Sequence, residues 1–162
     1  MGKILYNMKL TLGFSPCPND TFIFDALIHH KIDTKGLDFE VEYQDVETLN
    51  LKAFQGDLDI TKLSYHAFAY AVEDYELLDA GSALGFGVGP MLITKDPKLA
   101  KLLQQKLERA ESLEGFDQLK VGYPGKYTTA NFLLSLAFPE LKNKVELVFS
   151  DIEGALLDGS ID

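Results

Sequence analysis

The stretch Phe14-Ser-Pro-Cys-Pro-Asn-Asp-Thr-Phe-Ile-Phe24 joins an apolar run, Leu10–Phe14, to an amphipathic run that begins after Asn19-Asp20. Each X-Pro step disfavours helical backbone at the residue before it, and proline supplies no N–H. Asn19 or Asp20 is therefore expected to cap the following helix, whose first N–H groups are left free. The stretch predicts a stiff strand-to-helix corner with polar groups above a positive helix end, which suits a small anionic ligand. A proline-rich turn with a purely structural role is the alternative.

Strand-like and helix-like segments alternate along the rest of the sequence, with short turns between them. The predicted strands are Leu10–Phe14, Leu37–Tyr43, Leu58–Leu63, Tyr75–Leu78, Met91–Thr94, Leu119–Tyr123 and Lys144–Phe149. The predicted helices are Thr21–His30, Asp45–Phe54, Tyr65–Val72, Pro97–Ala110, Thr129–Phe138 and Asp151–Leu157. Apolar and acidic residues alternate over 37–43, which places that strand near a sheet edge. The expected fold class is α/β with a mainly parallel sheet.

Composition and length bound the classes of protein that this chain can represent. The 162 residues suffice for one domain or two small lobes, and 46% hydrophobic with 25% charged residues is ordinary for a soluble globular protein. No apolar stretch approaches the ~20 residues that span a bilayer. Met1–Asn7 carries one lysine and too short an apolar run for a signal peptide, and Met8 is a second candidate start. A cytoplasmic location is expected.

The net charge and the single cysteine exclude several kinds of partner and site. A net charge of −10 argues against nucleic acid and acidic membranes as partners. An anion would have to be bound locally, by helix N-termini, hydroxyls or a single lysine. Cys17, the one cysteine, excludes an internal disulfide and a cysteine-cluster metal site. A small buried apolar role for Cys17 is favoured over a nucleophile, because no histidine is near in the sequence.

Two further segments are candidate ligand loops in the first half of the chain. Lys62 and Ser64 lie where a predicted strand ends and a helix begins, and ligands collect at the carboxyl ends of parallel strands. A surface charge and a helix cap are the ordinary roles of these two residues, and His66 is favoured as a core histidine. The segment Gly81–Pro90 carries glycines that let backbone N–H groups approach a ligand, with Gly85 and Gly87 as candidates, although it fits neither a phosphate loop nor a dinucleotide loop. A flexible crossover between lobes is the alternative.

A third candidate loop, Gly125-Lys-Tyr-Thr-Thr-Ala130, lies between a predicted strand and an apolar helix. The hydroxyls of Thr128 and Thr129 and the free N–H groups of a helix start suit a carboxylate. Thr128 as a plain helix cap is the alternative. The paired threonines behind Pro124-Gly125 favour a ligand site.

Together these segments resemble the 1,4-dihydroxy-6-naphthoate synthase family of the futalosine route to menaquinone, and the match runs from about Met8 to the last residue. The segments that carry the resemblance are Phe14–Phe24, Asp45–Asn50, Thr61–Tyr65, Gly81–Gly85, Gly87–Pro90 and Thr128-Thr129. The resemblance implies a periplasmic-binding-protein-like (type II) two-lobed fold, with lobes over 8–93 and 94–162. It implies a lyase that converts cyclic dehypoxanthine futalosine to 1,4-dihydroxy-6-naphthoate without a metal or redox cofactor.

The resemblance also implies a substrate carboxylate and hydroxyls held between the lobes. The substrate-binding residues expected from the motifs and the resemblance are Ser15, Cys17, Asn19, Lys62, Ser64, Gly85, Gly87, Thr128 and Thr129. Phe86 departs from the arginine expected at that position in some members.

Family members are expected to be longer than this chain, which ends at Asp162. An Ile-Ile-His-Glu motif is expected to follow in them, and its histidine is the expected catalytic base. None of His29, His30 and His66 matches that position, so the catalytic residue is not assigned here. The chain is therefore expected to be an N-terminal portion, apparently truncated, without appreciable activity of its own.

Two other functions are alternatives to this interpretation. One is a solute-binding protein for a small carboxylate, which the lack of a secretion signal and the surroundings of Cys17 disfavour. The other is the related chorismate dehydratase of the same pathway, against which the Ser15–Asp20 loop favours the synthase.

Overall fold

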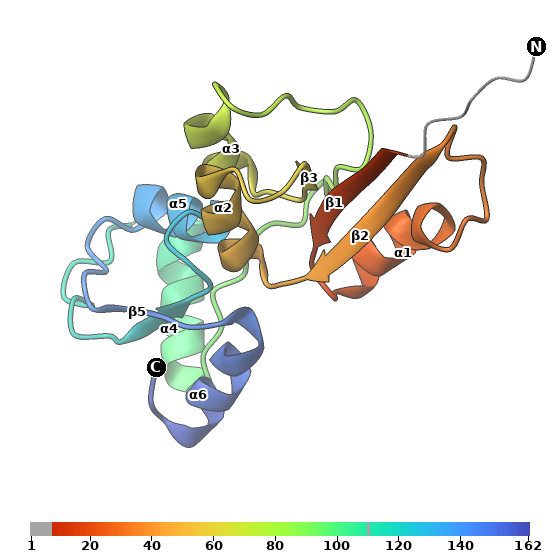
Figure 1. Cartoon of the computed structure of the whole chain (residues 1–162). Coiled ribbons are helices and arrows are strands. Elements are labelled where there is room, and N and C mark those ends of the chain that lie inside the picture. The colour runs from red at the N-terminus through yellow and green to blue at the C-terminus, as the bar shows by residue number, and fades with distance from the viewer. Residues whose placement is uncertain (1–7, 110) are drawn as a thin grey trace, which may run out of the picture. The chain divides into compact units, whose positions relative to one another are not determined.

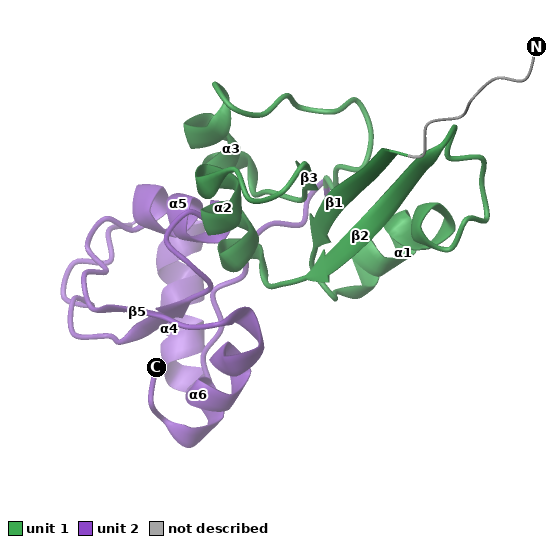
Figure 2. Cartoon of the chain, viewed as in Figure 1, with its two compact units in different colours: residues 1–84 green, residues 85–162 purple. Residues whose placement is uncertain are grey.

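The computed structural model describes residues 8–109 and 111–162 (Figure 1). The candidate start region Met1–Asn7 and Ala110, the predicted end of the charged helix, lie outside the described residues. The chain divides into two compact units, residues 1–84 (unit 1) and 85–162 (unit 2) (Figure 2). Within the described residues, no helix is both long enough and apolar enough to cross a membrane.

Unit 1 is a three-stranded parallel sheet with helices in its connections. Its elements are β1 (Met8–Phe14), α1 (Pro18–Ile28), β2 (Leu37–Tyr43), α2 (Val46–Gln55), β3 (Ile60–Thr61) and α3 (Tyr65–Ala71). The strand order is β2-β1-β3, so β2 is an edge strand, as its alternating sequence predicted. β1 pairs with β2 from Met8↔Leu37 to Phe14↔Tyr43, whereas β3 pairs with β1 only at Ile60 and Thr61.

The end of β1 and the helix α2 form the core of unit 1. Leu12, Phe14 and Leu49 are almost completely buried. The Phe14 ring lies 4.6 Å from the ring of Phe24 on α1 and 5.0 Å from that of Tyr43 on β2, measured between centroids. At Gly13 a Cβ atom would lie 2.8 Å from a methyl carbon of Leu49, so α2 packs closely against β1 and a larger residue here would displace the Leu49 side chain.

Helix α3 begins after Ser64, the cap that the sequence predicts, and α2 begins after Asp45, which was predicted to lie inside that helix. The Asp45 carboxylate accepts hydrogen bonds from the N–H groups of Glu47 and Thr48, and the Ser64 hydroxyl accepts one from Ala67. α2 ends at Gly56 in the left-handed conformation, with φ of 70°. These local signals fix both ends of α2 without help from the rest of the fold.

Helix α1 begins earlier than predicted, and the expectation that Asn19 or Asp20 caps it is wrong. Cys17 is the N-cap and Pro18 is the first helical residue, a position at which proline is well suited because its N–H is not needed. The N–H of Thr21 donates to the carbonyl oxygen of Cys17 at 3.0 Å. Asp20 therefore lies inside the first turn, where its side chain is free to point back along the chain.

Unit 2 contains a smaller parallel sheet. Its elements are α4 (Pro97–Glu108), β4 (Val121–Tyr123), α5 (Thr129–Ala137), β5 (Lys144–Glu146), the short 3-10 helix η1 (Phe149–Asp151) and α6 (Ile152–Asp158). β4 pairs with β5 in parallel, from Val121↔Lys144 to Tyr123↔Glu146. A core cluster of Leu103, Leu113 and Leu141 packs against partly buried residues that include Phe116 and Phe138. The parallel α/β class expected from the sequence is confirmed.

Two of the predicted strands, Tyr75–Leu78 and Met91–Thr94, are wrong. Tyr75 instead donates its backbone N–H to Ala71 and its hydroxyl to the carbonyl of Leu58, which holds the segment beside the end of α3. Met91 lies in an exposed segment without regular structure. Apolar composition favours a strand only where a partner strand offers its backbone groups, and neither segment has one among the described residues.

Thr11 and Asp59 exchange hydrogen bonds that hold β1 to the residue before β3. These hydrogen bonds predict an effect of pH on the stability of the protein. The N–H and hydroxyl of Thr11 each donate to the Asp59 carboxylate at 2.8 Å, and the Asp59 N–H donates back to the Thr11 hydroxyl at 2.7 Å. The hydrogen bonds from the Thr11 backbone and side chain lower the pKa of Asp59 below its ordinary 3.8. The resulting stabilisation is present above pH 3.8 and is lost as the pH falls through the lowered pKa.

We expect Asp59→Asn to lack part of the acid-induced loss of stability that the unmodified chain shows. The measurement is urea unfolding at a series of pH values from 5 downward. Asp57→Asn is the matched control, because Asp57 is exposed two residues away. It should keep the acid-induced loss of the unmodified chain. An identical pH dependence in Asp59→Asn would contradict the prediction.

Candidate functional site

Two of the predicted site residues, Ser15 and Lys62, meet at the carboxyl edge of the unit 1 sheet. Ser15 follows β1 and Lys62 follows β3, and the two strands run in parallel, so both residues lie at the same edge. The N–H of Lys62 donates to the carbonyl of Gly13 at 2.8 Å, which extends the pairing of the two strands. This is the edge at which α/β sheets bind ligands.

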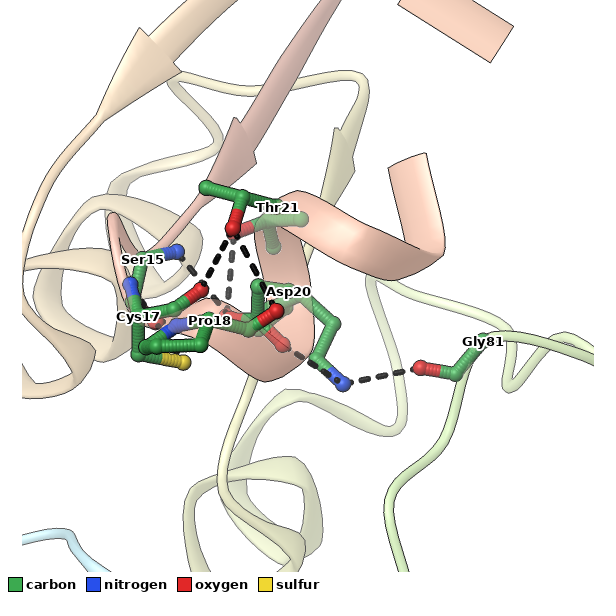
Figure 3. A network of polar contacts seen from close by, with 8 residues as sticks. Ser15, Cys17, Pro18, Asp20, Thr21 and Gly81 are labelled. Atoms are coloured by element: carbon green, nitrogen blue, oxygen red, sulfur yellow. Dashed lines mark hydrogen bonds and ion pairs between the residues drawn. The ribbon is translucent and has the colours of Figure 1, made fainter. Parts of the chain in front are cut away.

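The carboxylate of Asp20 connects these two residues, and Figure 3 shows Asp20 beside Ser15. Its Oδ2 accepts hydrogen bonds from the N–H of Ser15 at 3.1 Å and from the Ser15 hydroxyl at 2.8 Å. Its Oδ1 lies 3.4 Å from the Lys62 ammonium, which also donates to the carbonyl of Gly81 at 2.8 Å. Ser15 and Asp20 are each only 6% exposed, so the charge of Asp20 is stabilised by these partners. We call Ser15, Asp20, Lys62 and Gly81 the Asp20 network.

Cys17 lies beside this network, but it is exposed, so the expectation that it is a buried apolar group is wrong. Its position as N-cap between Pro16 and Pro18 directs it away from the core of unit 1. The Cys17 sulfur is 2.9 Å from the Ser15 hydroxyl oxygen. Asn19, also exposed, lies in the first turn of α1, and no side chain of the described residues caps that helix.

Ser64 lies at the same edge and connects to two buried polar residues of α2. Its N–H donates to Asn50 Oδ1 at 3.2 Å, and Asn50 Nδ2 donates to Glu47 Oε2 at 3.0 Å. Asn50 is completely buried and Glu47 nearly so. The sequence prediction missed Asn50, Glu47 and Asp20 as parts of this edge. The signal was the pair of polar residues Glu47 and Asn50 three positions apart on a helix, a spacing that places them on one face.

In unit 2 the structure separates the roles of the two threonines. The buried Thr128 hydroxyl donates to the carbonyl of Gly125 at 2.7 Å and accepts from the N–H of Asn131 at 3.3 Å, so Thr128 is the cap of α5. Thr129 is the first helical residue and partly exposed. Within residues 8–109 and 111–162, its hydroxyl makes no hydrogen bond. Of the two hydroxyls, that of Thr129 is therefore available to a ligand.

The glycine-rich segment contains the boundary between the two units, at Leu84 and Gly85. At Gly85 an added Cβ atom would overlap a methyl group of Val88 at 2.2 Å, which shows that the segment turns tightly. Gly87 has φ of 67°, a conformation that favours glycine. The close approach of the Val88 side chain accounts for Gly85 and the positive φ accounts for Gly87, and the contact of either residue with a ligand stays a prediction.

The described residues offer groups that are chemically suited to a small polar molecule. Hydroxyls, the Lys62 ammonium and the first turn of α1 suit the oxygens of a hydroxylated or anionic ligand. Among residues 8–109 and 111–162, no three histidine, cysteine, aspartate or glutamate side chains gather as a metal site.

Comparison with known proteins gives consistent matches. The family model described as menaquinone biosynthesis matches residues 10–162. A protein of Thermus thermophilus named 1,4-dihydroxy-6-naphthoate synthase is 47% identical over 127 residues, which are 78% of this chain and 41% of that protein. A protein of Streptomyces coelicolor with the same name is 34% identical over 158 residues, which are 94% of this chain and 50% of that protein.

A solved structure also resembles the chain. An X-ray crystal structure of a protein from Archaeoglobus fulgidus matches with a TM-score of 0.76 and 34% identity, and the match covers 95% of this chain and 52% of that one. The chain thus spans about half the length of the relatives that it matches.

Proposed function

Since the chain belongs to the menaquinone biosynthesis family, we propose that the protein acts as a 1,4-dihydroxy-6-naphthoate synthase, a lyase of that pathway. The resemblance inferred from the sequence motifs is confirmed at the level of the family. The 47% identity to the Thermus thermophilus protein carries the proposal, because that relative has this name. Neither alternative, the solute-binding protein or the chorismate dehydratase, is favoured by a relative's name.

The proposed substrate is cyclic dehypoxanthine futalosine, bound through its carboxylate and hydroxyls. The proposed location of the protein is the cytoplasm. In unit 1 the proposed contacts come from Ser15, Cys17, Asn19, Lys62 and Ser64, and in unit 2 from Gly85, Gly87, Thr128 and Thr129. The grouping of Ser15, Lys62 and Ser64 at one sheet edge supports the unit 1 contacts. The proposal requires no metal or redox cofactor.

The proposed fold is the two-lobed fold of periplasmic binding proteins, with lobes over 8–93 and 94–162. Two compact units, each with a parallel sheet and helical connections, support it. The unit boundary at Leu84 and Gly85 lies nine residues before the proposed lobe boundary at 93 and 94.

Binding by the purified chain tests the proposed function. We expect calorimetric titration to show binding of cyclic dehypoxanthine futalosine in preference to a small dicarboxylate. Turnover to 1,4-dihydroxy-6-naphthoate is followed in the same samples by chromatography. Equal affinity for both ligands would favour a solute-binding protein, and no binding of the futalosine derivative would contradict the proposal.

Thr129→Ala is expected to weaken binding of cyclic dehypoxanthine futalosine and to leave stability nearly unchanged. A hydrogen bond to a charged group contributes roughly 1.5–3 kcal/mol, so the affinity should fall by about tenfold or more. Thr128→Ala is the matched control, because loss of the cap of α5 should cost about 0.5–2 kcal/mol of folding free energy. The measurements are calorimetry and thermal unfolding of both variants. Unchanged affinity in Thr129→Ala would remove this residue from the site.

A further inference from the structure

The hydrogen-bond partners of the Asp20 carboxylate differ from those that are usual at its position in a helix. A carboxylate at the third position of a helix commonly accepts the N–H of the capping residue. Here it reaches past Cys17 and past Pro16, which has no N–H, to both donors of Ser15. Its second oxygen faces Lys62 from a different element of the fold. One buried carboxylate thus joins two of the residues proposed to bind substrate.

The positions of the protons in the Asp20 network determine whether the Ser15 hydroxyl can donate a hydrogen bond to a ligand or accept one. A serine hydroxyl has one proton to donate and lone pairs to accept with. Two acceptors lie near the Ser15 oxygen, the Asp20 carboxylate at 2.8 Å and the Cys17 sulfur at 2.9 Å. The carboxylate is the stronger acceptor, so it takes the proton. The N–H of Cys17 donates to the same oxygen at 3.4 Å and so uses one of its two lone pairs. With its proton on Asp20, Ser15 therefore has its second lone pair left to accept a hydrogen bond from a ligand.

The protons of the Lys62 ammonium group can be assigned to partners in the same way. An ammonium group has three protons. One is donated to the carbonyl of Gly81 and one is directed at Asp20, so one has no partner among residues 8–109 and 111–162. The Lys62 side chain is 20% exposed, which leaves that proton a route to solvent or ligand. Because two contacts hold the group, the remaining donor has a fixed direction.

We propose that Asp20 is a positioning residue of the substrate site, one that fixes Ser15 as an acceptor and Lys62 as a donor. The pair then selects a ligand that presents a hydroxyl to Ser15 and a carbonyl or anionic oxygen to Lys62. This inference rests on the proposed function for the identity of the ligand. Asp20 itself does not touch the ligand, and its effect is exerted through the two side chains that it orients.

Asp20→Asn tests this role, because the amide keeps the volume of the side chain and replaces one oxygen with a donor that opposes Lys62. We expect roughly tenfold to hundredfold weaker binding of cyclic dehypoxanthine futalosine with a thermal midpoint close to that of the unmodified chain. Asp25→Asn is the matched control, since it removes a carboxylate of the same helix whose side chain is 45% exposed and pairs with Lys31, and it should leave binding unchanged.

Two further measurements separate positioning from a structural role. Ser15→Ala should weaken binding in the unmodified chain and add little in Asp20→Asn, a non-additivity that loss of stability alone does not produce. Acetylation of Lys62, followed by mass spectrometry with Lys52 as internal reference, should be several-fold faster in Asp20→Asn. Lys52 is a suitable reference because it is paired with Glu42 at 2.6 Å, away from the substitution.

The outcomes distinguish the inference from the proposed function. Unchanged binding in Asp20→Asn, or a Ser15→Ala effect of equal size in both backgrounds, would overturn the positioning role. If the unmodified chain does not bind the futalosine derivative, the proposed function fails, and the acetylation rate alone decides. An unchanged rate at Lys62 in Asp20→Asn would then overturn the inference.

Discussion

Replacing Phe14 with alanine is expected to lower the free energy of unfolding by about 3–5 kcal/mol. The Phe14 side chain has no solvent exposure and contacts the rings of Phe24 and Tyr43, so its removal leaves a cavity between β1, α1 and β2. Phe14 also directly precedes Ser15, and a shift of the strand end would displace the Asp20 network. The loss should therefore appear in ligand binding as well as in stability.

Urea unfolding followed by circular dichroism measures this effect. Phe22→Ala is the control, because Phe22 lies on α1 and is 85% exposed. The same change of side chain there should alter stability by no more than about 0.5 kcal/mol. Equal losses in the two variants would mean that burial of Phe14 does not stabilise unit 1 as described.

The second large effect is expected at Gly13, where alanine should destabilise the protein by about 1–3 kcal/mol. The added Cβ would lie 2.6 Å from Leu58 Cδ1 and 2.8 Å from Leu49 Cδ2. Both leucines are buried, so neither methyl group has free space to move into. The strand would have to move away from α2, and Ser15 would move with it.

Gly154→Ala is the matched comparison, and it is expected to raise the stability of the protein instead of lowering it. Gly154 lies inside α6, and an added Cβ would meet no atom within 4 Å. Alanine favours the helix over glycine by roughly 0.5–1 kcal/mol, so this variant should be more stable than the unmodified chain. Thermal and urea unfolding measure both variants. A stabilised Gly13→Ala protein would contradict the close packing of α2 against β1.

The features predicted correctly from the sequence are those that neighbouring residues determine. The alternation over 37–43 is a local pattern, and it identified β2 and its edge position. Ser64 was predicted as a helix cap because a short polar side chain before an apolar helix needs no distant contact to act. The cap role of Thr128, which was the alternative to a ligand site, rests on the same local pattern.

The features that were missed depend on contacts between distant segments. The burial of Asp20 depends on Lys62, which is far along the chain and approaches only because β1 and β3 pair. The apolar segment Met91–Thr94 was predicted as a strand, but no strand pairs with it among the described residues. For Cys17, composition indicated burial, whereas its place between two prolines at a helix start exposes it.

The unequal pairing of β1 with its two neighbours has a consequence for the order of folding. β1 pairs with β2 along its whole length but with β3 at two residues only. The β1-α1-β2 segment therefore gains most of its backbone contacts from one loop closure, and it is expected to form the nucleus in the transition state. Changes in β3 should then mainly accelerate unfolding, which stopped-flow kinetics of Ile60→Val would show. Lys62 is then expected to reach Asp20 only in the late step, so that the candidate site is completed after the sheet that supports it.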